Sequence, residues 1–153
     1  MTTRTVSALD RLSPKVHARL AKLARPVIYP AGAVVLREGT DTPFLCAILE
    51  GRVALRFRVP ERGDRLTLVT VEPGELLGWS AVVPPYRATV DAIATESTRL
   101  LAIDAAALRE RLAVDCELAA ELLPLVLESV SDRLSASWQQ LLDMFGARGP
   151  EPW

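Results

Sequence analysis

Short apolar runs separated by turn residues fill the chain from about residue 25 to residue 103. The run from Phe44 to Leu49 is continuously apolar, which is typical of a strand buried on both faces. Residues 53–58 instead carry a large apolar side chain at every second position, as a half-buried strand does. About eight such strands at nearly even spacing, with no helical pattern between them, predict an eight-stranded antiparallel β-roll, a double-stranded β-helix of the jelly-roll type.

Helical patterns flank this mainly β region on both sides. Ser13 and Pro14 form a capping hydroxyl followed by a proline, which predicts a helix that ends before Pro26. Two helices are expected after the strands, one over about residues 105–112 and one that extends to about residue 145. Pro124 should kink the last helix or restart it, because proline lacks the amide donor that the helix interior needs.

The length of 153 residues suits one domain with a substantial core. We expect this domain to span residues 13–146. The β-roll should occupy about residues 25–103, and the C-terminal helices about 105–145. Residues 1–12 are expected to be a flexible N-terminus, and residues 147–153, rich in glycine and proline, a disordered tail.

Composition excludes several classes of function. The formal net charge is −1, without the basic face of a nucleic-acid-binding protein. No apolar run approaches the roughly 20 residues that cross a bilayer, and the N-terminus lacks a signal-peptide core, so a cytoplasmic protein without membrane contact is expected. His17 is the single histidine and has no metal-ligand or catalytic partner at suitable spacing, so neither an enzyme nor a metal site is expected. Cys46 and Cys116 both fall in apolar surroundings and are expected to be buried thiols.

The segment from Gly74 to Ala92 contains the candidate binding site. It predicts a strand end, a turn at Gly78, a very short helix and a loop stopped by two prolines. Backbone amides around such a turn can bind an anion, and Arg87 at the start of the next strand could pair with it. The alternative is an ordinary connection between strands with a surface arginine.

An apolar stripe continues along the last helix beyond the length that the β-roll can cover. This predicts a homodimer that pairs through the helix, since an exposed stripe of this kind is buried by a second copy. The alternative is a helix that folds entirely onto its own domain. The residues of the stripe are Leu127, Val130, Leu134, Trp138, Leu141 and Phe145.

Several segments resemble the cyclic-nucleotide-binding domain of the catabolite-activator/FNR (Crp/Fnr) regulator superfamily. They read YPAGAVVLREGTDTPFLCAILEGRVAL, VEPGELLGWSAV, RATVDAIATESTRLLAID and ALRERL. The resemblance runs from about Val16 to Phe145. It implies the fold predicted above and identifies the segment after Gly74 as the phosphate-binding cassette, with site residues Gly78, Trp79, Ser80, Ala81, Tyr86, Arg87, Ala88 and Thr89.

Two positions depart from the pattern that this resemblance implies. Trp79 stands where the family's glutamate accepts the ribose hydroxyl, and an indole only donates a hydrogen bond. Tyr86 stands at the position of the phosphate-binding arginine, while Arg87 is one residue late, on the opposite face of the strand unless the proline loop absorbs the offset. The resemblance therefore implies weak or absent binding of cyclic AMP and cyclic GMP.

The function implied is a stand-alone regulatory or sensor domain that signals through an unidentified protein partner. The alternative is an interaction or assembly module that keeps the β-roll and binds no nucleotide. No cofactor is required, and the only ligands implied are a cyclic nucleotide or a simple anion. The residues after Phe145 are too few for the family's DNA-binding helix-turn-helix, so no nucleic-acid partner is expected.

Overall fold

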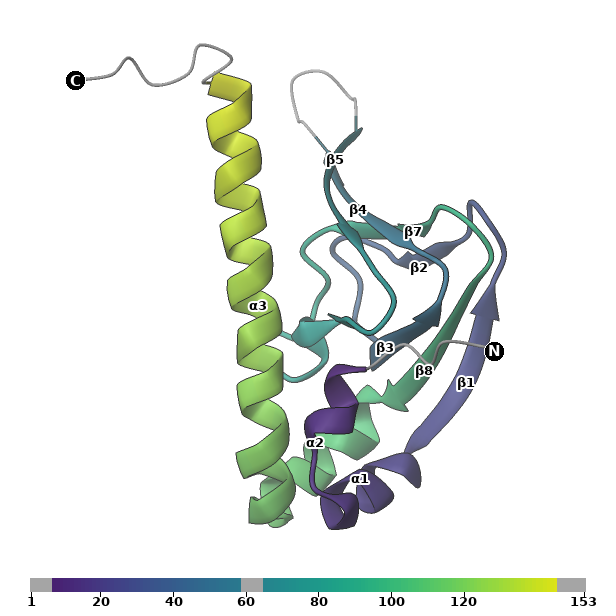
Figure 1. The fold of residues 1–153 in the computed structure, drawn as a ribbon, viewed down its shortest axis with the longest axis vertical. Coiled ribbons are helices and arrows are strands. Elements are labelled where there is room, and N and C mark those ends of the chain that lie inside the picture. Colours follow the sequence, from purple (N-terminus) through teal and green to yellow (C-terminus); the bar gives the residue numbers. More distant parts are fainter. Residues whose placement is uncertain (1–6, 59–64, 146–153) are drawn as a thin grey trace, which may run out of the picture.

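A computed structural model describes residues 7–58 and 65–145. Within these ranges two four-stranded antiparallel sheets form the β-roll, with strand orders β1-β8-β3-β6 and β2-β7-β4-β5 (Figure 1). The predicted mainly β fold with flanking helices is confirmed. The strands are β1 (Ala24–Tyr29), β2 (Val34–Leu36), β3 (Phe44–Glu50), β4 (Val53–Arg58), β5 (Arg65–Val71), β6 (Leu76–Leu77), β7 (Asp91–Ala94) and β8 (Thr98–Asp104).

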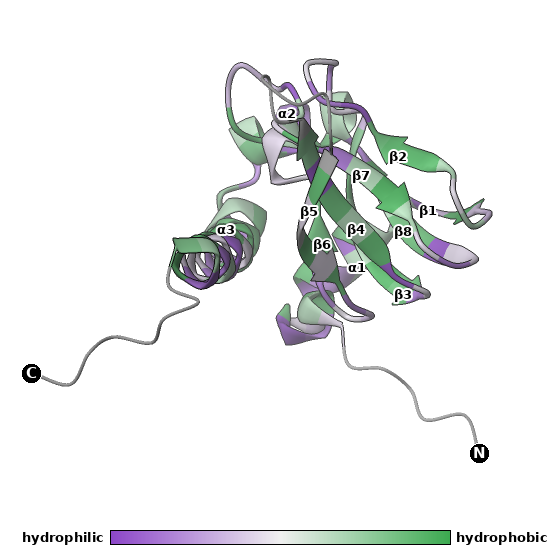
Figure 2. Cartoon of the chain, turned by 90° about the horizontal axis from the view of Figure 1, so that it is seen from above, coloured by the Kyte–Doolittle hydropathy of each residue, from purple (hydrophilic) through white to green (hydrophobic). Residues whose placement is uncertain are grey.

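Helices lie below the sheets and along one side of them. In Figure 1, α1 and α2 are at the foot of the roll, and α3 runs past its side. Seen from above in Figure 2, α3 stands end-on beside the sheets. The helical elements are η1 (Ala8–Arg11), α1 (Pro14–Ala21), η2 (Trp79–Ala81), α2 (Ala105–Val114) and α3 (Cys116–Phe145).

The position of strand β3 in the fold explains why its sequence is apolar at successive residues instead of alternating. It lies between β8 and β6, and residues 44–48 are all buried. Leu45 and Ala47 point into a core formed with the helices, whereas Cys46 and Ile48 point into the core between the two sheets. Successive side chains of a strand alternate between faces, and here both faces are covered.

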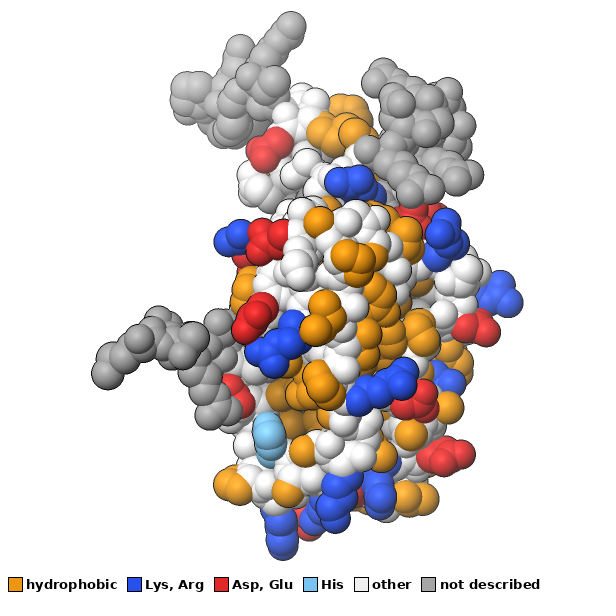
Figure 3. Space-filling model, turned by 90° about the vertical axis from the view of Figure 1, so that its right-hand side faces the viewer, with side chains coloured by type: hydrophobic (Ala, Val, Ile, Leu, Met, Phe, Trp, Pro, Cys, Tyr) orange, Lys and Arg blue, Asp and Glu red, His pale blue; other side chains and the backbone are white. Residues whose placement is uncertain are grey.

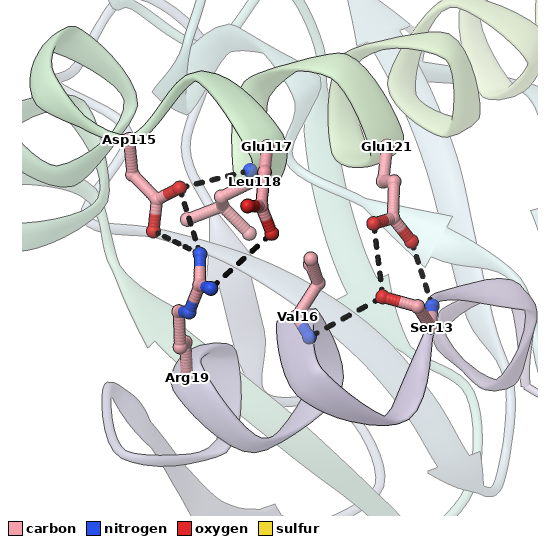
Figure 4. Close-up of polar contacts among 7 residues, drawn as sticks. All are labelled: Ser13, Val16, Arg19, Asp115, Glu117, Leu118 and Glu121. Carbon is pink, nitrogen blue, oxygen red and sulfur yellow. Dashed lines mark hydrogen bonds and ion pairs between the residues drawn. The ribbon is translucent and has the colours of Figure 1, made fainter.

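Polar contacts fix α1 against the start of α3 (Figure 4). The Glu121 carboxylate accepts hydrogen bonds from the Ser13 amide at 2.7 Å and from its hydroxyl at 2.9 Å. One turn along, Arg19 donates to both carboxylate oxygens of Asp115 at 3.0 Å and to Glu117 at 3.2 Å. These contacts set where α3 leaves the domain and hence which face it turns to the roll.

Helix α3 is continuous through Pro124, so of the two expected effects of this proline, a kink or a restart, the restart does not occur. Its first half is held by buried side chains on both sides of the proline, including Leu122, Leu125 and Val126, and this packing offsets the missing amide. From Leu127 onward most of the large apolar side chains are exposed in the chain by itself, although Val130 is half-buried. The exposed set is Leu127, Leu134, Trp138, Leu141, Leu142, Met144 and Phe145.

Two expectations about order and burial need correction. Residues 7–12, expected to be flexible, form η1 and its cap, because Leu9 and Leu12 are buried in the helical core. Cys46 is buried as expected, but Cys116 is exposed because it begins α3 on the outer side of the helix. Residues 1–6, residues 59–64 and the expected tail at 147–153 lie outside the described residues.

The surface carries charges of both signs. On the face drawn in Figure 3, lysine and arginine are interspersed with aspartate and glutamate around hydrophobic side chains. Among the described helices, none is long and apolar enough to cross a membrane. Within the same residues, no group of three or more histidine, cysteine, aspartate or glutamate side chains could hold a metal ion.

Candidate ligand pocket

The candidate cassette begins where β6 ends against β3. Leu76 and Leu77 pair with Ala47 and Cys46, and the chain then turns at Gly78, whose φ is 89°. A Cβ atom at Gly78 would lie 2.5 Å from the Phe44 carbonyl oxygen, closer than real contacts allow. Only glycine therefore fits this turn, for reasons of both backbone angle and space.

The short helix η2 follows and is held from below by a buried hydroxyl pair. The Ser80 and Thr42 hydroxyl oxygens lie 2.6 Å apart, and both residues are buried. The amide of Ala81 donates to the Gly78 carbonyl, so it is not free to bind an anion. Ala81, predicted as a site residue, instead packs its side chain into the core beneath the helices.

Tyr86 turns away from the cassette toward α2. It has a left-handed backbone, with φ of 63°, and its ring lies under the Arg109 guanidinium at 4.4 Å from carbon to ring centroid. Arg109 also donates to the Ala81 carbonyl at 2.8 Å, which ties α2 to η2. Tyr86 thus stands at the position that the resemblance gives to the family's arginine, but its ring packs against Arg109 of α2.

Arg87 is also directed outward. Its side chain is 64% exposed, and its Nε lies 3.8 Å from the Asp41 carboxylate. The backbone explains this direction, because residue 87 pairs with residue 41 in an isolated antiparallel bridge while the Ala88 side chain beside it is buried. The proline loop has not turned the Arg87 side chain inward.

Five of the predicted cassette residues do come together. Gly78, Trp79, Ser80, Ala88 and Thr89 line one hollow, which we call the inner recess; its volume is about 20 Å³. Tyr86 and Arg87 are not among its lining residues. A space of this size holds about one water molecule, so the recess is nearly filled by the protein itself.

One side chain that lines the recess comes from α3, and the sequence analysis did not select it. Arg133 lines the recess, donates to the Ser129 hydroxyl at 2.9 Å and donates to the Leu76 carbonyl. Its Nε is buried and has no hydrogen-bond partner among the described atoms. Burial lowers the pKa of this guanidinium, and the more distant carboxylates of Glu75 and Asp132 oppose the shift.

A signal for Arg133 does exist in the sequence. Val126, Val130 and Arg133 follow one another at helical spacing. The arginine therefore lies on the same face of α3 as Val126, which is buried. A charged residue on a buried helix face usually has a specific partner or role. The pattern alone does not say whether that face meets the roll or a second chain.

Two larger spaces adjoin the recess. The outer cavity, of about 260 Å³, lies between the roll and α3 and shares Trp79 and Arg133 with the recess. The helix groove, of about 520 Å³, lies on the other side of Trp79. Its lining residues are all apolar: Trp79, Val82, Val83, Leu123, Pro124, Val126, Leu127 and Val130.

The family of this chain follows from comparison with known proteins. The cyclic nucleotide-binding domain family matches residues 26–115, more than half of the chain and nearly all of the roll. The chain belongs to this family. It is a Crp/Fnr-type cyclic nucleotide-binding domain, and the domains of this family are regulatory.

Individual relatives agree with the assignment. The CRP-like cAMP-activated global transcriptional regulator of Mycobacterium tuberculosis is 26% identical over 152 residues, which cover 90% of this chain and 67% of the regulator. The N-terminal domain of a Streptomyces coelicolor A3(2) transcriptional regulator has a TM-score of 0.67 at 27% identity, covering 85% of this chain and 91% of that one. A cyclic nucleotide-binding domain from Methylobacillus flagellatus has a TM-score of 0.78 at 22% identity, over 87% and 74% of the two chains, which supports the fold alone.

Proposed function

We propose that this cyclic nucleotide-binding domain is a regulatory module that binds cyclic AMP and cyclic GMP weakly or not at all. The observation that supports this most directly is the small size of the inner recess beside Gly78, which Arg133 of α3 also lines. The recess has a volume of about 20 Å³, far below that of a usual small-molecule site, which is about 300–1,000 Å³.

The side chains of the cassette support the same proposal. Trp79 provides no carboxylate for a ribose hydroxyl, and Arg87 is exposed beside Asp41 rather than directed into the recess. Each charge-assisted hydrogen bond to a ligand contributes roughly 1.5–3 kcal/mol. Absence of both contacts reduces affinity by two or more orders of magnitude, because about 1.4 kcal/mol corresponds to a factor of ten.

Titration calorimetry with cyclic AMP and cyclic GMP tests this proposal. We expect no saturable heat up to millimolar nucleotide, and no rise in melting temperature. The cAMP-activated regulator of Mycobacterium tuberculosis serves as the positive control. Micromolar binding by the present chain would contradict the proposal.

We further propose that the module acts through protein contacts, first of all with a second copy of itself. The exposed second half of α3 supports this, since Phe145 is 84% and Trp138 58% exposed in the chain by itself. Monomeric proteins rarely expose a continuous apolar stripe of this kind. The alternative, an interaction module with a different protein partner, is supported by the same surface and by the apolar helix groove beside it. The mass in solution distinguishes the two.

A further inference from the structure

Two connected spaces meet at the Arg133 side chain. The inner recess and the outer cavity share Trp79, Thr89 and Arg133 among their lining residues, so a molecule in the cavity would lie against the same arginine side chain that lines the recess. The cavity is bounded by β4 and β5 on one side and by α3 on the other. It is therefore a site between the roll and the helix.

The lining of the outer cavity suits an apolar molecule. Among the described residues that line it, Arg133 is the one charged side chain, and Thr89 and Ser137 add hydroxyl groups. The rest of the lining is hydrophobic: Leu55, Val69, Trp79, Val90, Val130 and Leu134. Apolar surface of this kind favours a hydrocarbon or aromatic body over a hydrated sugar.

The positively charged Arg133 side chain has no anionic partner among the described residues. Two of its hydrogen bonds go to neutral oxygens, of Ser129 and Leu76, and its Nε has no partner among the described atoms. No carboxylate of the described residues lies within ion-pair distance of it; Glu75 and Asp132 act only from farther away. A guanidinium held in this way pairs strongly with a planar carboxylate, which can accept two of its N–H groups.

The size of the site limits the ligand. The recess of about 20 Å³ has no room for a ribose phosphate, while the cavity of about 260 Å³ accepts a small apolar body. A molecule with its charged end at Arg133 and its body in the outer cavity would fit without moving Trp79. This geometry excludes a large polyanion and leaves a compact monoanion.

We propose that this site binds a small apolar carboxylate, with the carboxylate on Arg133 and the hydrocarbon between the roll and α3. The inference rests on the proposed function, because it assigns to the same pocket a ligand that replaces the cyclic nucleotide. Arg133 is the specificity-determining residue in this assignment. The apolar lining supplies affinity, and the single arginine selects the charge of the head group.

Three probes that differ only in their head group test the assignment: octanoate, octan-1-ol and octylamine. Titration of the full chain should give saturable octanoate binding, octanol binding weaker by about tenfold or more, and no octylamine binding, since charge-assisted pairing is worth at least that factor. Equal affinity for octanoate and octanol, or no octanoate binding at millimolar concentration, would overturn the proposal. These comparisons need no variant.

Two matched arginine variants locate the carboxylate. Arg133→Gln should lower octanoate affinity to that of octanol and leave octanol unchanged, whereas Arg87→Gln, at an exposed arginine, should change neither. Unchanged octanoate affinity in Arg133→Gln would overturn the assignment.

Val69→Trp, which fills the outer cavity, should weaken octanoate and octanol together, and failure to do so would equally count against the site. Cyclic AMP is titrated separately, so that micromolar binding of the nucleotide refutes the proposed function whatever octanoate does.

Discussion

Arg109 of α2 stacks its guanidinium on the ring of Tyr86, 4.4 Å from the ring centroid, and so holds the loop after η2 against the helix. The same guanidinium donates to the Ala81 carbonyl, which fixes both ends of the loop at once. Tyr86 has a left-handed backbone at this point, an arrangement that surrounding contacts must maintain.

Arg109→Ala should therefore loosen the loop. We expect a loss of roughly 1–3 kcal/mol in the free energy of unfolding, from the cation–π contact and the hydrogen bond together. Amide exchange across residues 80–88 should accelerate. Glu110→Ala, one residue along on the exposed side of α2, is the control and should change neither measurement.

Tyr86→Arg should not restore nucleotide binding, because the new guanidinium would meet Arg109.

Gly78→Ala should destabilise the domain more than Gly39→Ala. Both glycines have a positive φ, so each substitution incurs a backbone cost of about 1–2 kcal/mol. Only at Gly78 would the new Cβ also meet a backbone oxygen, that of Phe44 at 2.5 Å, whereas nothing lies within 4 Å at Gly39. The difference between the urea midpoints of the two variants therefore measures the destabilisation that comes from the contact of the new Cβ with the Phe44 oxygen. Equal midpoints would contradict the turn geometry.

The two cysteines should differ sharply in reactivity. Burial raises the pKa of the Cys46 thiol to about 12, so almost no thiolate forms at neutral pH, and its side chain is inaccessible as well. Cys116 is exposed. A native-state alkylation followed by mass spectrometry should modify Cys116 alone, and both cysteines after denaturation. Rapid native labelling of Cys46 would show that β3 is not the central strand.

The link between α1 and α3 should weaken in acid. A hydrogen bond from the Leu118 amide, together with Arg19, lowers the pKa of the Asp115 carboxyl in the folded chain. A lowered folded pKa stabilises the domain above the ordinary aspartate pKa of about 3.9, and this contribution disappears as the pH falls through the folded pKa. Asp115→Asn should thus unfold at lower urea than the parent at pH 7, and the difference should vanish in strong acid. Glu117→Gln, at a more exposed partner of Arg19, should show a smaller effect at pH 7.

Self-association should depend on the middle of α3. We expect a dimer mass by light scattering at tens of micromolar protein, and a monomer mass for Leu134→Asp, because a charge would be buried in the apolar contact. Leu134 is 55% exposed in the single chain, so this variant should remain folded by circular dichroism. Ser135→Asp, on the neighbouring exposed position, should stay dimeric. A monomer mass for the parent chain would exclude pairing through this helix.

The sequence determined the local elements. The continuous apolar run of β3, the alternation in β4, the capping residue Ser13 and the turn at Gly78 all follow from short-range periodicity and backbone sterics, and the structure contains each of them. Local patterns marked the segment from Gly74 to Ala92 as a candidate site, and the family resemblance named the residues of the cassette within it.

Only the tertiary structure decided which side chains meet in the pocket. Arg133 reaches the recess because contacts such as Ser13 with Glu121 and Arg19 with Asp115 fix the direction of α3, and the partners are about a hundred residues apart in the chain (Figure 4). Tyr86 packs outward because Arg109, on another helix, lies over its ring. Periodicity gives the face of a helix or strand on which a residue lies, but what covers that face depends on packing between distant segments.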